Sequence, residues 1–145
     1  MVKLSTGTFK FVLRTPTGTL IDCRAGSIIF PAHDGLQGVL RNHVPMLCKL
    51  GLGIVQVKDI TGRDDAYFVI NGGFARISEN NVAVLSFDVV TFEGKTDEEI
   101  ESILSKAQSH VAGGAYIETQ TGEEIDIPKA RLIVKMAEMI TAEKE

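Results

Sequence analysis

The chain has 145 residues, of which 44% are hydrophobic and 23% are charged, a balance that is typical of a packed globular protein and too apolar for a disordered one. This length fits one domain, or one domain with a small addition, and excludes two full-sized domains. The formal net charge of −4 argues against general nucleic-acid binding, which needs a basic surface to displace counterions. We therefore expect no nucleic-acid partner.

Neither a membrane span nor a secretion signal is expected. The apolar run Ala66–Ala75 is too short to span a bilayer and is interrupted by Asn71 and two glycines. The N-terminus lacks the apolar stretch and cleavage site of a secretion signal, so we expect the protein to stay in the compartment where it is made. Cys23 and Cys48 are too few for a disulfide framework or a four-thiolate zinc site. We expect both to be reduced and partly buried.

The first 87 residues carry the pattern of β-strands. In Phe9–Arg14, every second residue is large and apolar, which predicts a half-buried strand. A turn is predicted at Pro16-Thr17-Gly18. Similar short apolar runs follow at Thr19–Cys23, Ser27–Phe30, Gly53–Val57, Tyr67–Ile70, Phe74–Ile77 and Val82–Phe87. Many short strands at close spacing predict an antiparallel β-sandwich or barrel.

Three segments between these runs predict changes of chain direction. Asn71-Gly72-Gly73 offers residues that tolerate positive φ, and Ser78–Asn81 offers a polar turn, so each predicts a hairpin. The segment Asp34–Arg41 contains Gly35 and Gly38 and is predicted to be a polar loop with sharp turns.

Charge and periodicity both change near residue 88. Residues 1–87 contain nine Lys and Arg against six Asp and Glu, whereas residues 88–145 contain six against thirteen. Thr96-Asp97-Glu98-Glu99 is a capping box, which predicts the start of a helix. Its apolar stripe is Ile100, Ile103, Leu104, Ala107 and Val111. Gly113-Gly114 is predicted to end it, and His110 is expected to complement its C-terminal carbonyl groups.

A second helix is predicted from about Asp126, with Pro128 in its first turn. Its apolar face is Ala130, Ile133, Val134, Ala137 and Ile140. The link Ala115–Ile125 is long and polar and could itself form a small β-hairpin. We predict a mixed, two-part fold, with an N-terminal antiparallel β-sandwich over residues 1–88 and a C-terminal α-helical hairpin over residues 89–145.

The sequence contains no set of residues that indicates catalysis. His33 and His43, with Asp34, match no standard zinc spacing and have no third His or Cys nearby. Gly51-Leu52-Gly53 lacks the Lys-Ser/Thr continuation of a phosphate-binding loop. We therefore expect no catalytic residues, no cofactor and no metal site.

Four blocks, in this order and spacing, resemble the epsilon subunit of the F-type ATP synthase, which is called delta in mitochondria: Pro31–Leu47, Leu50–Gly53, Phe68–Ala75 and Asn81–Leu85. The resemblance implies a non-catalytic subunit of the central stalk that couples ion flow through the ring of c subunits to ATP synthesis through gamma. It implies gamma and the c ring as partners, with the catalytic alpha/beta head as a further candidate. The protein would then lie on the cytoplasmic face of a bacterial inner membrane, held there only through the complex.

The resemblance also implies which residues meet each partner. The c-ring interface would comprise Asp34, Gly35, Leu36, Gln37, Gly38 and Arg41, and the gamma interface would comprise Asn42, His43, Pro45 and Met46. Each group has a purely structural alternative, which is a turn without a partner for the first and a hydrogen-bonded loop histidine for the second.

Two further functional alternatives stay open. Some epsilon subunits bind ATP through an Ile/Leu-Asp-x-x-Arg/Lys-Ala motif on the first hairpin helix. Ile125–Ala130 fits it by letter but falls at the start of the second helix, where a helix cap is the simpler interpretation. The rival classes are a free-standing ligand-binding β-sandwich with a helical oligomerisation tail, and a small hydrolase that uses His43 with a carboxylate.

Overall fold

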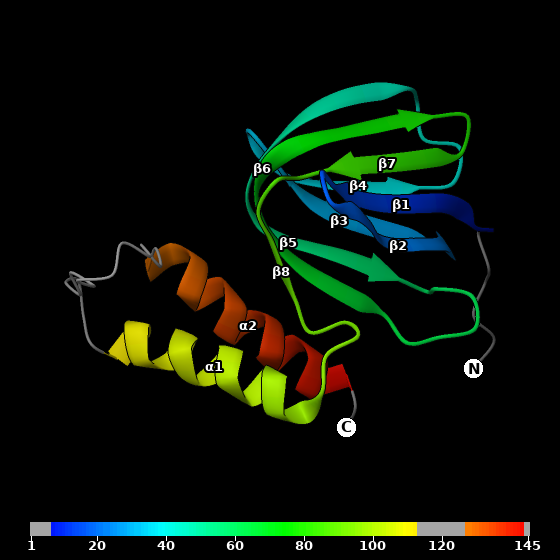
Figure 1. Ribbon diagram of the computed structural model, residues 1–145. Coiled ribbons are helices and arrows are strands. Elements are labelled where there is room, and N and C mark those ends of the chain that lie inside the picture. Colours follow the sequence, from blue (N-terminus) through cyan, green and yellow to red (C-terminus); the bar gives the residue numbers. More distant parts are fainter. Residues whose placement is uncertain (1–6, 113–126, 144–145) are drawn as a thin grey trace.

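The computed structural model describes residues 7–112 and 127–143. Within them the chain forms eight strands followed by two helices (Figure 1). The elements are β1 (Phe9–Thr15), β2 (Gly18–Ala25), β3 (Ser27–Ala32), β4 (Gly35–Leu40), β5 (Met46–Lys58), β6 (Ala66–Ser78), β7 (Asn81–Leu85), β8 (Val89–Thr91), α1 (Asp97–Ala112) and α2 (Ile127–Glu143). The predicted fold, a β-sandwich followed by a helical hairpin, is confirmed.

The strands form one sheet that folds over itself into two layers. Its order is β2-β1-β7-β6-β5-β3-β4, and β8 pairs with the first half of β6. The second half of β6 pairs with β7 instead, so β6 belongs to both layers, as does β5, which pairs with it along most of its length. Neighbouring strands are antiparallel except β1 and β7, which run parallel. The prediction of an antiparallel sandwich therefore holds for every described pair but that one.

Between the two layers lies a continuous apolar core. Phe9, Phe11 and Leu13 are buried, as the alternation predicts, and they pack with Phe30 from β3 and Phe68 from β6. The core continues through Ile28, Val39, Cys48, Leu50, Val55, Val57, Ile70, Ala75, Ile77, Val82 and Val84. Burial of this apolar surface is the main force that holds the layers together.

The predicted hairpin at Asn71-Gly72-Gly73 is wrong, because β6 runs through it without reversing. The two glycines bend the strand instead, with φ of 84° at Gly72 and 128° at Gly73. A Cβ at Gly73 would lie 2.2 Å from the carbonyl oxygen of Leu85. Opposite the bend, the buried Ser86 hydroxyl donates to the Gly72 carbonyl at 2.7 Å. The glycines are needed for a close crossing of two strands rather than for a turn.

The predicted polar loop Asp34–Arg41 is also wrong. Residues 35–40 form β4, an edge strand that pairs with β3 after a two-residue turn at His33–Asp34. Val39 faces the core opposite Ile28, and Leu36 points outward opposite Pro31. Glycine and glutamine hide this alternation in the sequence. The other two predicted reversals are confirmed, at residues 16–18 between β1 and β2 and at residues 78–81 between β6 and β7.

The two helices lie antiparallel to one another against one layer of the sandwich (Figure 1). α1 begins with the predicted capping box, because the Glu99 amide donates to the Thr96 hydroxyl at 3.3 Å and the Thr96 amide donates to the Glu99 carboxylate at 3.4 Å. The predicted apolar face of α2 is largely confirmed, since Ala130 and Ile133 are buried. Met136, which the sequence does not single out, is buried as well. No helix in these described ranges is both long and apolar enough to cross a lipid bilayer.

α2 packs on the outer face of the layer that contains β8. Ala130, Ile133 and Met136 contact Ile54 of β5 and Val69 of β6 in a second apolar cluster. A lysine–aspartate pair adds a polar contact at the start of the helix, where the Lys129 ammonium group donates to Asp88 at 2.6 Å. The helical hairpin is therefore joined to the sandwich by apolar packing and one ion pair.

Several predictions lie outside the described residues or beyond the strand pattern. The helix stop at Gly113-Gly114, the cap at Asp126, the link Ala115–Ile125 and the side chain of His110 are not among the described residues. The sequence predicts that strands end at Phe87, whereas β8 continues the sheet to Thr91. The sheet thus extends past the proposed boundary at residue 88.

Candidate partner-binding surfaces

Large apolar side chains are exposed on two parts of the sandwich. On β4, Leu36 is 72% exposed and Leu40 is 55% exposed. The second set is Leu20, Leu47, Phe74, Leu85 and Phe87 from the layer opposite the helices and from the bend. Exposed apolar patches that neighbour one another are typical of surfaces that bind partners.

The structure separates the residues predicted for the c-ring interface. Asp34 lies in the turn before β4 and Arg41 follows the end of the strand, so they are about 20 Å apart at ~3.3 Å per residue. Leu36 is exposed near the turn, whereas Gln37 is half-buried. These six residues therefore form an edge strand with two ends and not one compact loop.

The residues predicted for the gamma interface form the connection from β4 to β5. His43 is half-buried, and its Nδ1–H donates to the Val44 carbonyl at 2.7 Å. With that proton on Nδ1, the neutral ring leaves Nε2 to accept from the Gln37 amide at 3.4 Å. His43 is thus held by neighbouring groups, and this connection is tied to β4.

A pair of asparagines joins the same connection to the β6–β7 turn. Asn42 has a φ of 66°, and its backbone N–H donates to the Asn80 side chain at 2.6 Å. The Asn80 amide donates in return to the Asn42 side chain at 3.1 Å. Pro45 and Met46 follow, the first exposed and the second half-buried. The loop is therefore anchored at both ends, and Val44, at its tip, is 69% exposed.

Sequence reasoning missed a larger surface, which we call the basic-apolar face. It consists of two adjacent rows across four paired strands, Leu47–Arg76–Ala83–Val12 and Lys49–Phe74–Leu85–Arg14. Within these rows three cations stand beside exposed leucine and phenylalanine side chains, and no acidic residue occurs. The face lies on the layer that the helices leave uncovered (Figure 1).

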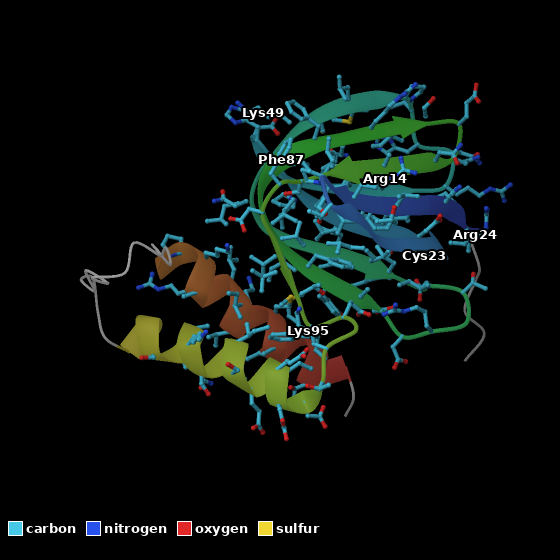
Figure 2. The ribbon with its side chains drawn as sticks, viewed as in Figure 1. Arg14, Cys23, Arg24, Lys49, Phe87 and Lys95 are labelled. Carbon is cyan, nitrogen blue, oxygen red and sulfur yellow. The ribbon has the colours of Figure 1, made fainter. Side chains whose placement is uncertain are left out.

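The ends of this face can be followed among the labelled side chains. Lys49 and Phe87 lie close to the bend, whereas Arg14 lies further along the layer (Figure 2). The backbone N–H of His33 donates to the Lys49 carbonyl at 2.9 Å, so the turn before β4 is adjacent to that end. The bend thus brings the turn residues and the exposed Phe87 to the same end of the sandwich. The alternation of Leu47 with Lys49 and of Phe74 with Arg76 was the sequence signal for the face.

Neither cysteine resembles a reactive thiol. Cys23 and Cys48 are free, and burial raises the pKa of both thiols. For Cys48 the nearby Asp34 carboxylate raises the pKa further. A raised pKa leaves less thiolate at neutral pH, and thiolate is the nucleophilic form. Among the described residues, no three His, Cys, Asp or Glu side chains gather as metal ligands would.

Comparison with known proteins gives one consistent family. A family model described as ATP synthase, Delta/Epsilon chain, beta-sandwich domain matches residues 8–92. The chain is 32% identical over 101 residues to the ATP synthase epsilon chain of Nitratiruptor, an alignment that covers 70% of this chain and 78% of that one. It is 26% identical over 137 residues to the sodium ion specific ATP synthase epsilon chain of Propionigenium modestum, covering 94% and 95% of the two chains.

Solved structures show the same fold at low sequence identity. A chain in the mitochondrial ATP synthase of Euglena gracilis matches with a TM-score of 0.54 and 19% identity, covering 99% of this chain and 88% of that one. A chain in the central stalk and c-ring assembly of Tetrahymena thermophila matches with a TM-score of 0.51 and 12% identity, covering 92% and 90%. The family model spans more than half of the sequence, and the chain belongs to the ATP synthase delta/epsilon family.

Proposed function

We propose that this chain is a non-catalytic rotor subunit of the central stalk of an F-type ATP synthase, joining gamma to the ring of c subunits. The observation that carries the proposal, besides family membership, is a packed sandwich with two sets of exposed apolar side chains. A coupling element needs a rigid body and two contact surfaces, and it needs no reactive group. The ring contact and the gamma contact then transmit torque during ATP synthesis.

For the c ring, we propose the end of the sandwich that carries the turn before β4. Asp34, Gly35 and Leu36 lie there, and Gln37 and Gly38 follow them along the strand. Leu36 is the strongest candidate for an apolar contact because it is 72% exposed on an edge strand. Arg41, at the far end of β4, is the weakest member of the predicted group.

For gamma, we propose the connection of Asn42, His43, Pro45 and Met46 together with the adjoining part of the basic-apolar face. Leu47 directly follows this connection and is 73% exposed. The cations of the face favour an acidic partner surface and would speed and orient the encounter more than they hold the complex. Apolar burial around Leu47 and Phe74 would supply most of the affinity.

The helical hairpin is proposed to be regulatory, and the catalytic alpha/beta head is its candidate target. The assembly would place the chain on the cytoplasmic face of a bacterial inner membrane as a peripheral component. Relatives named as bacterial epsilon chains support that side. The coupling ion is determined by other subunits, so the sodium-specific relative carries no conclusion for this chain.

Co-purification tests the proposal. The tagged full-length chain, expressed in cells that lack their own copy and recovered from detergent-solubilised membranes, is expected to bring gamma and the c ring. Leu36→Glu with Leu40→Glu is expected to lose the ring and keep gamma, whereas Leu47→Glu with Phe74→Glu is expected to lose gamma. Thr61→Glu, in the exposed β5–β6 loop, is the matched control.

Each variant is first checked for an unchanged melting temperature, because exposed substitutions usually change stability by only about 0.5 kcal/mol. If the wild-type chain is recovered alone or as a homo-oligomer, the rotor assignment is wrong. If both double variants still bring both partners, the assembly stands and the assigned surfaces are wrong.

A further inference from the structure

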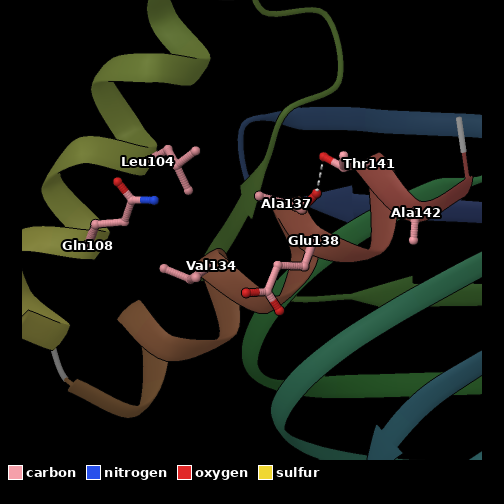
Figure 3. Close-up of a pocket in the computed structure, with 7 residues that line it drawn as sticks. All are labelled: Leu104, Gln108, Val134, Ala137, Glu138, Thr141 and Ala142. Atoms are coloured by element: carbon pink, nitrogen blue, oxygen red, sulfur yellow. Dashed lines mark hydrogen bonds between the residues drawn. The ribbon is translucent and has the colours of Figure 1, made fainter. Parts of the chain in front are cut away.

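A groove that the proposed function does not use runs along the seam between the two helices. Its first part is a hollow of about 380 Å³ lined by both helices (Figure 3). Its second part, of about 660 Å³, continues from there to the loops at the edge of the sandwich. Leu104, Ala137 and Thr141 line both parts, so the two are continuous. We call the whole the hairpin groove.

The floor of the hairpin groove is apolar. It is formed by half-buried side chains from the loop after β8, from α1 and from α2: Phe92, Ile100, Leu104, Val134, Ala137 and Ile140. On α1 the lining extends from Asp97 to Gln108, which is about 17 Å at ~1.5 Å per residue. That length matches about three turns of a further helix laid along the seam.

The rim of the hairpin groove is acidic. Asp64, Asp65, Asp97 and Glu138 line it, and the single lining cation, Arg63, is paired with Glu93 at 2.6 Å. The Arg63–Glu93 pair is only partly exposed, so its charge is already compensated within the groove. The rim therefore favours a cationic ligand and repels an anionic one.

This charge argues against a nucleotide in the groove. Phosphate groups are bound by unpaired Arg or Lys or by a free helix N-terminus, and the α1 N-terminus is covered by its own acidic residues. Lys129, the basic residue of the sequence segment that resembles a nucleotide motif, lies outside the lining and is engaged by Asp88 at 2.6 Å. The chemistry of the groove thus differs from that of a phosphate site.

We propose that the hairpin groove binds a basic amphipathic helix of a partner protein. Apolar side chains of that helix would fill the floor between Leu104 and Ala137, while its Lys or Arg side chains would meet the acidic rim. Helix-in-groove binding of this kind uses anchors at spacings of three and four residues. The inference adds a contact on the hairpin to the two proposed for the sandwich and does not depend on either.

Titration with synthetic peptides tests the proposal on the full-length chain. The probe is an 18-residue amphipathic peptide of Leu and Lys, and the matched control peptide carries Glu in place of Lys. Two-dimensional amide NMR of the labelled chain is expected to show saturable shifts for groove residues with the Lys peptide and none with the Glu peptide. The groove assignment is wrong if the shifts scatter over the sandwich or if ATP produces them instead.

Variants separate groove binding from general charge attraction. Asp64→Asn with Glu138→Gln is expected to weaken binding of the Lys peptide about tenfold at low salt, about threefold for each lost charge. Leu104→Gln, on the floor, is expected to weaken it at both low and high salt. Asp22→Asn, an exposed acid on β2, is the matched control and should leave the affinity unchanged. An equal loss from Asp22→Asn, or no loss from Leu104→Gln in a folded chain, overturns the proposal.

Discussion

Gly73 has the least room of the glycines on the bend of the sandwich. Its φ of 128° is one that residues with a Cβ rarely adopt, and the added atom would meet the Leu85 carbonyl at 2.2 Å and the Ser86 Cα at 3.0 Å. Both obstacles are backbone, which cannot rotate away. We expect Gly73→Ala to lower the free energy of unfolding by about 3 kcal/mol, measured by urea denaturation followed by circular dichroism.

Gly38 supplies the control for this prediction. It lies on the edge strand β4 with a φ outside the left-handed region, and a Cβ there would meet nothing within 4 Å. Gly38→Ala is expected to be neutral, or to stabilise the protein by up to ~1 kcal/mol by restricting the unfolded chain. Equal effects of the two substitutions would show that the crossing at Gly73 is not tight.

The two cysteines predict a loss of stability at alkaline pH. Burial raises the pKa of both thiols above the ordinary value of 9.0. Below pH 9.0 both states keep the proton, and their contribution to stability is fully present. As the pH rises past 9.0, the unfolded chain releases the protons while the folded chain retains them, so unfolding becomes easier.

The measurement is the free energy of unfolding as a function of pH for the wild-type chain and for Cys23→Ala with Cys48→Ala. We expect the wild-type curve to fall more steeply above pH 9.0 than the variant curve. Only the difference in slope is compared, because other groups also titrate there and because removal of two side chains has its own cost. Parallel curves would contradict the prediction.

At the scale of elements, the ion pair between Lys129 and Asp88 joins the start of α2 to the sandwich. The atoms are 2.6 Å apart, and the side chains are 20% and 41% exposed. Partial exposure limits the contribution of such a pair to about 0.5–1 kcal/mol. We expect Lys129→Met to increase amide hydrogen exchange in α2 by a few fold while the core strands keep their protection.

Lys135→Met is the control, because Lys135 is an exposed lysine on the same helix without an ion pair to another described residue. Asp88→Asn should reproduce the effect of Lys129→Met, and the double variant should add little to either one. If the three variants exchange like the wild type, apolar packing alone holds the helix.

Elements that depend on local signals could be predicted from the sequence. The alternation in Phe9–Leu13 and the capping box at Thr96 involve residues within one strand or one turn, and both are confirmed. The bend at Gly72-Gly73 could not be predicted, since two glycines suit a reversal and a bend equally. The deciding contacts come from Leu85 and Ser86, which are distant in the sequence.

Surfaces are harder to predict than elements, for a similar reason. Leu36 could be named from the sequence because a short segment around it resembles a known family. The basic-apolar face could not, because Lys49, Phe74 and Leu85 become neighbours only through the registers of three strands. Arg41 was grouped with Asp34 because a strand containing two glycines and a glutamine resembles a loop.

At the scale of the whole molecule, the limit of the sandwich can be tested by truncation. Cutting after Phe87 removes β8, which pairs with β6 and whose buried Thr91 hydroxyl donates to the Tyr67 carbonyl at 3.0 Å. Cutting after Gly94 keeps both. We expect residues 1–94 to unfold cooperatively and residues 1–87 to be less stable by about 2 kcal/mol or more, measured by urea denaturation.

Both fragments lose the helices, so both expose Ile54 and Val69 and should be less stable than the full chain. Equal stability of the two fragments would place the end of the folding unit at residue 88, as first proposed. Failure of the longer fragment to unfold cooperatively would mean that the sandwich depends on the hairpin.

The bend has a mechanical consequence. Because β5 and β6 each pass from one layer into the other, a force applied to one layer reaches the other along covalent backbone. In a sandwich of two separate sheets, the same force would cross only through side-chain packing, and the layers could slide. Shearing this sandwich would require breaking a row of strand hydrogen bonds together. The crossing at Gly73 thus makes the two layers a single elastic body with little internal slack.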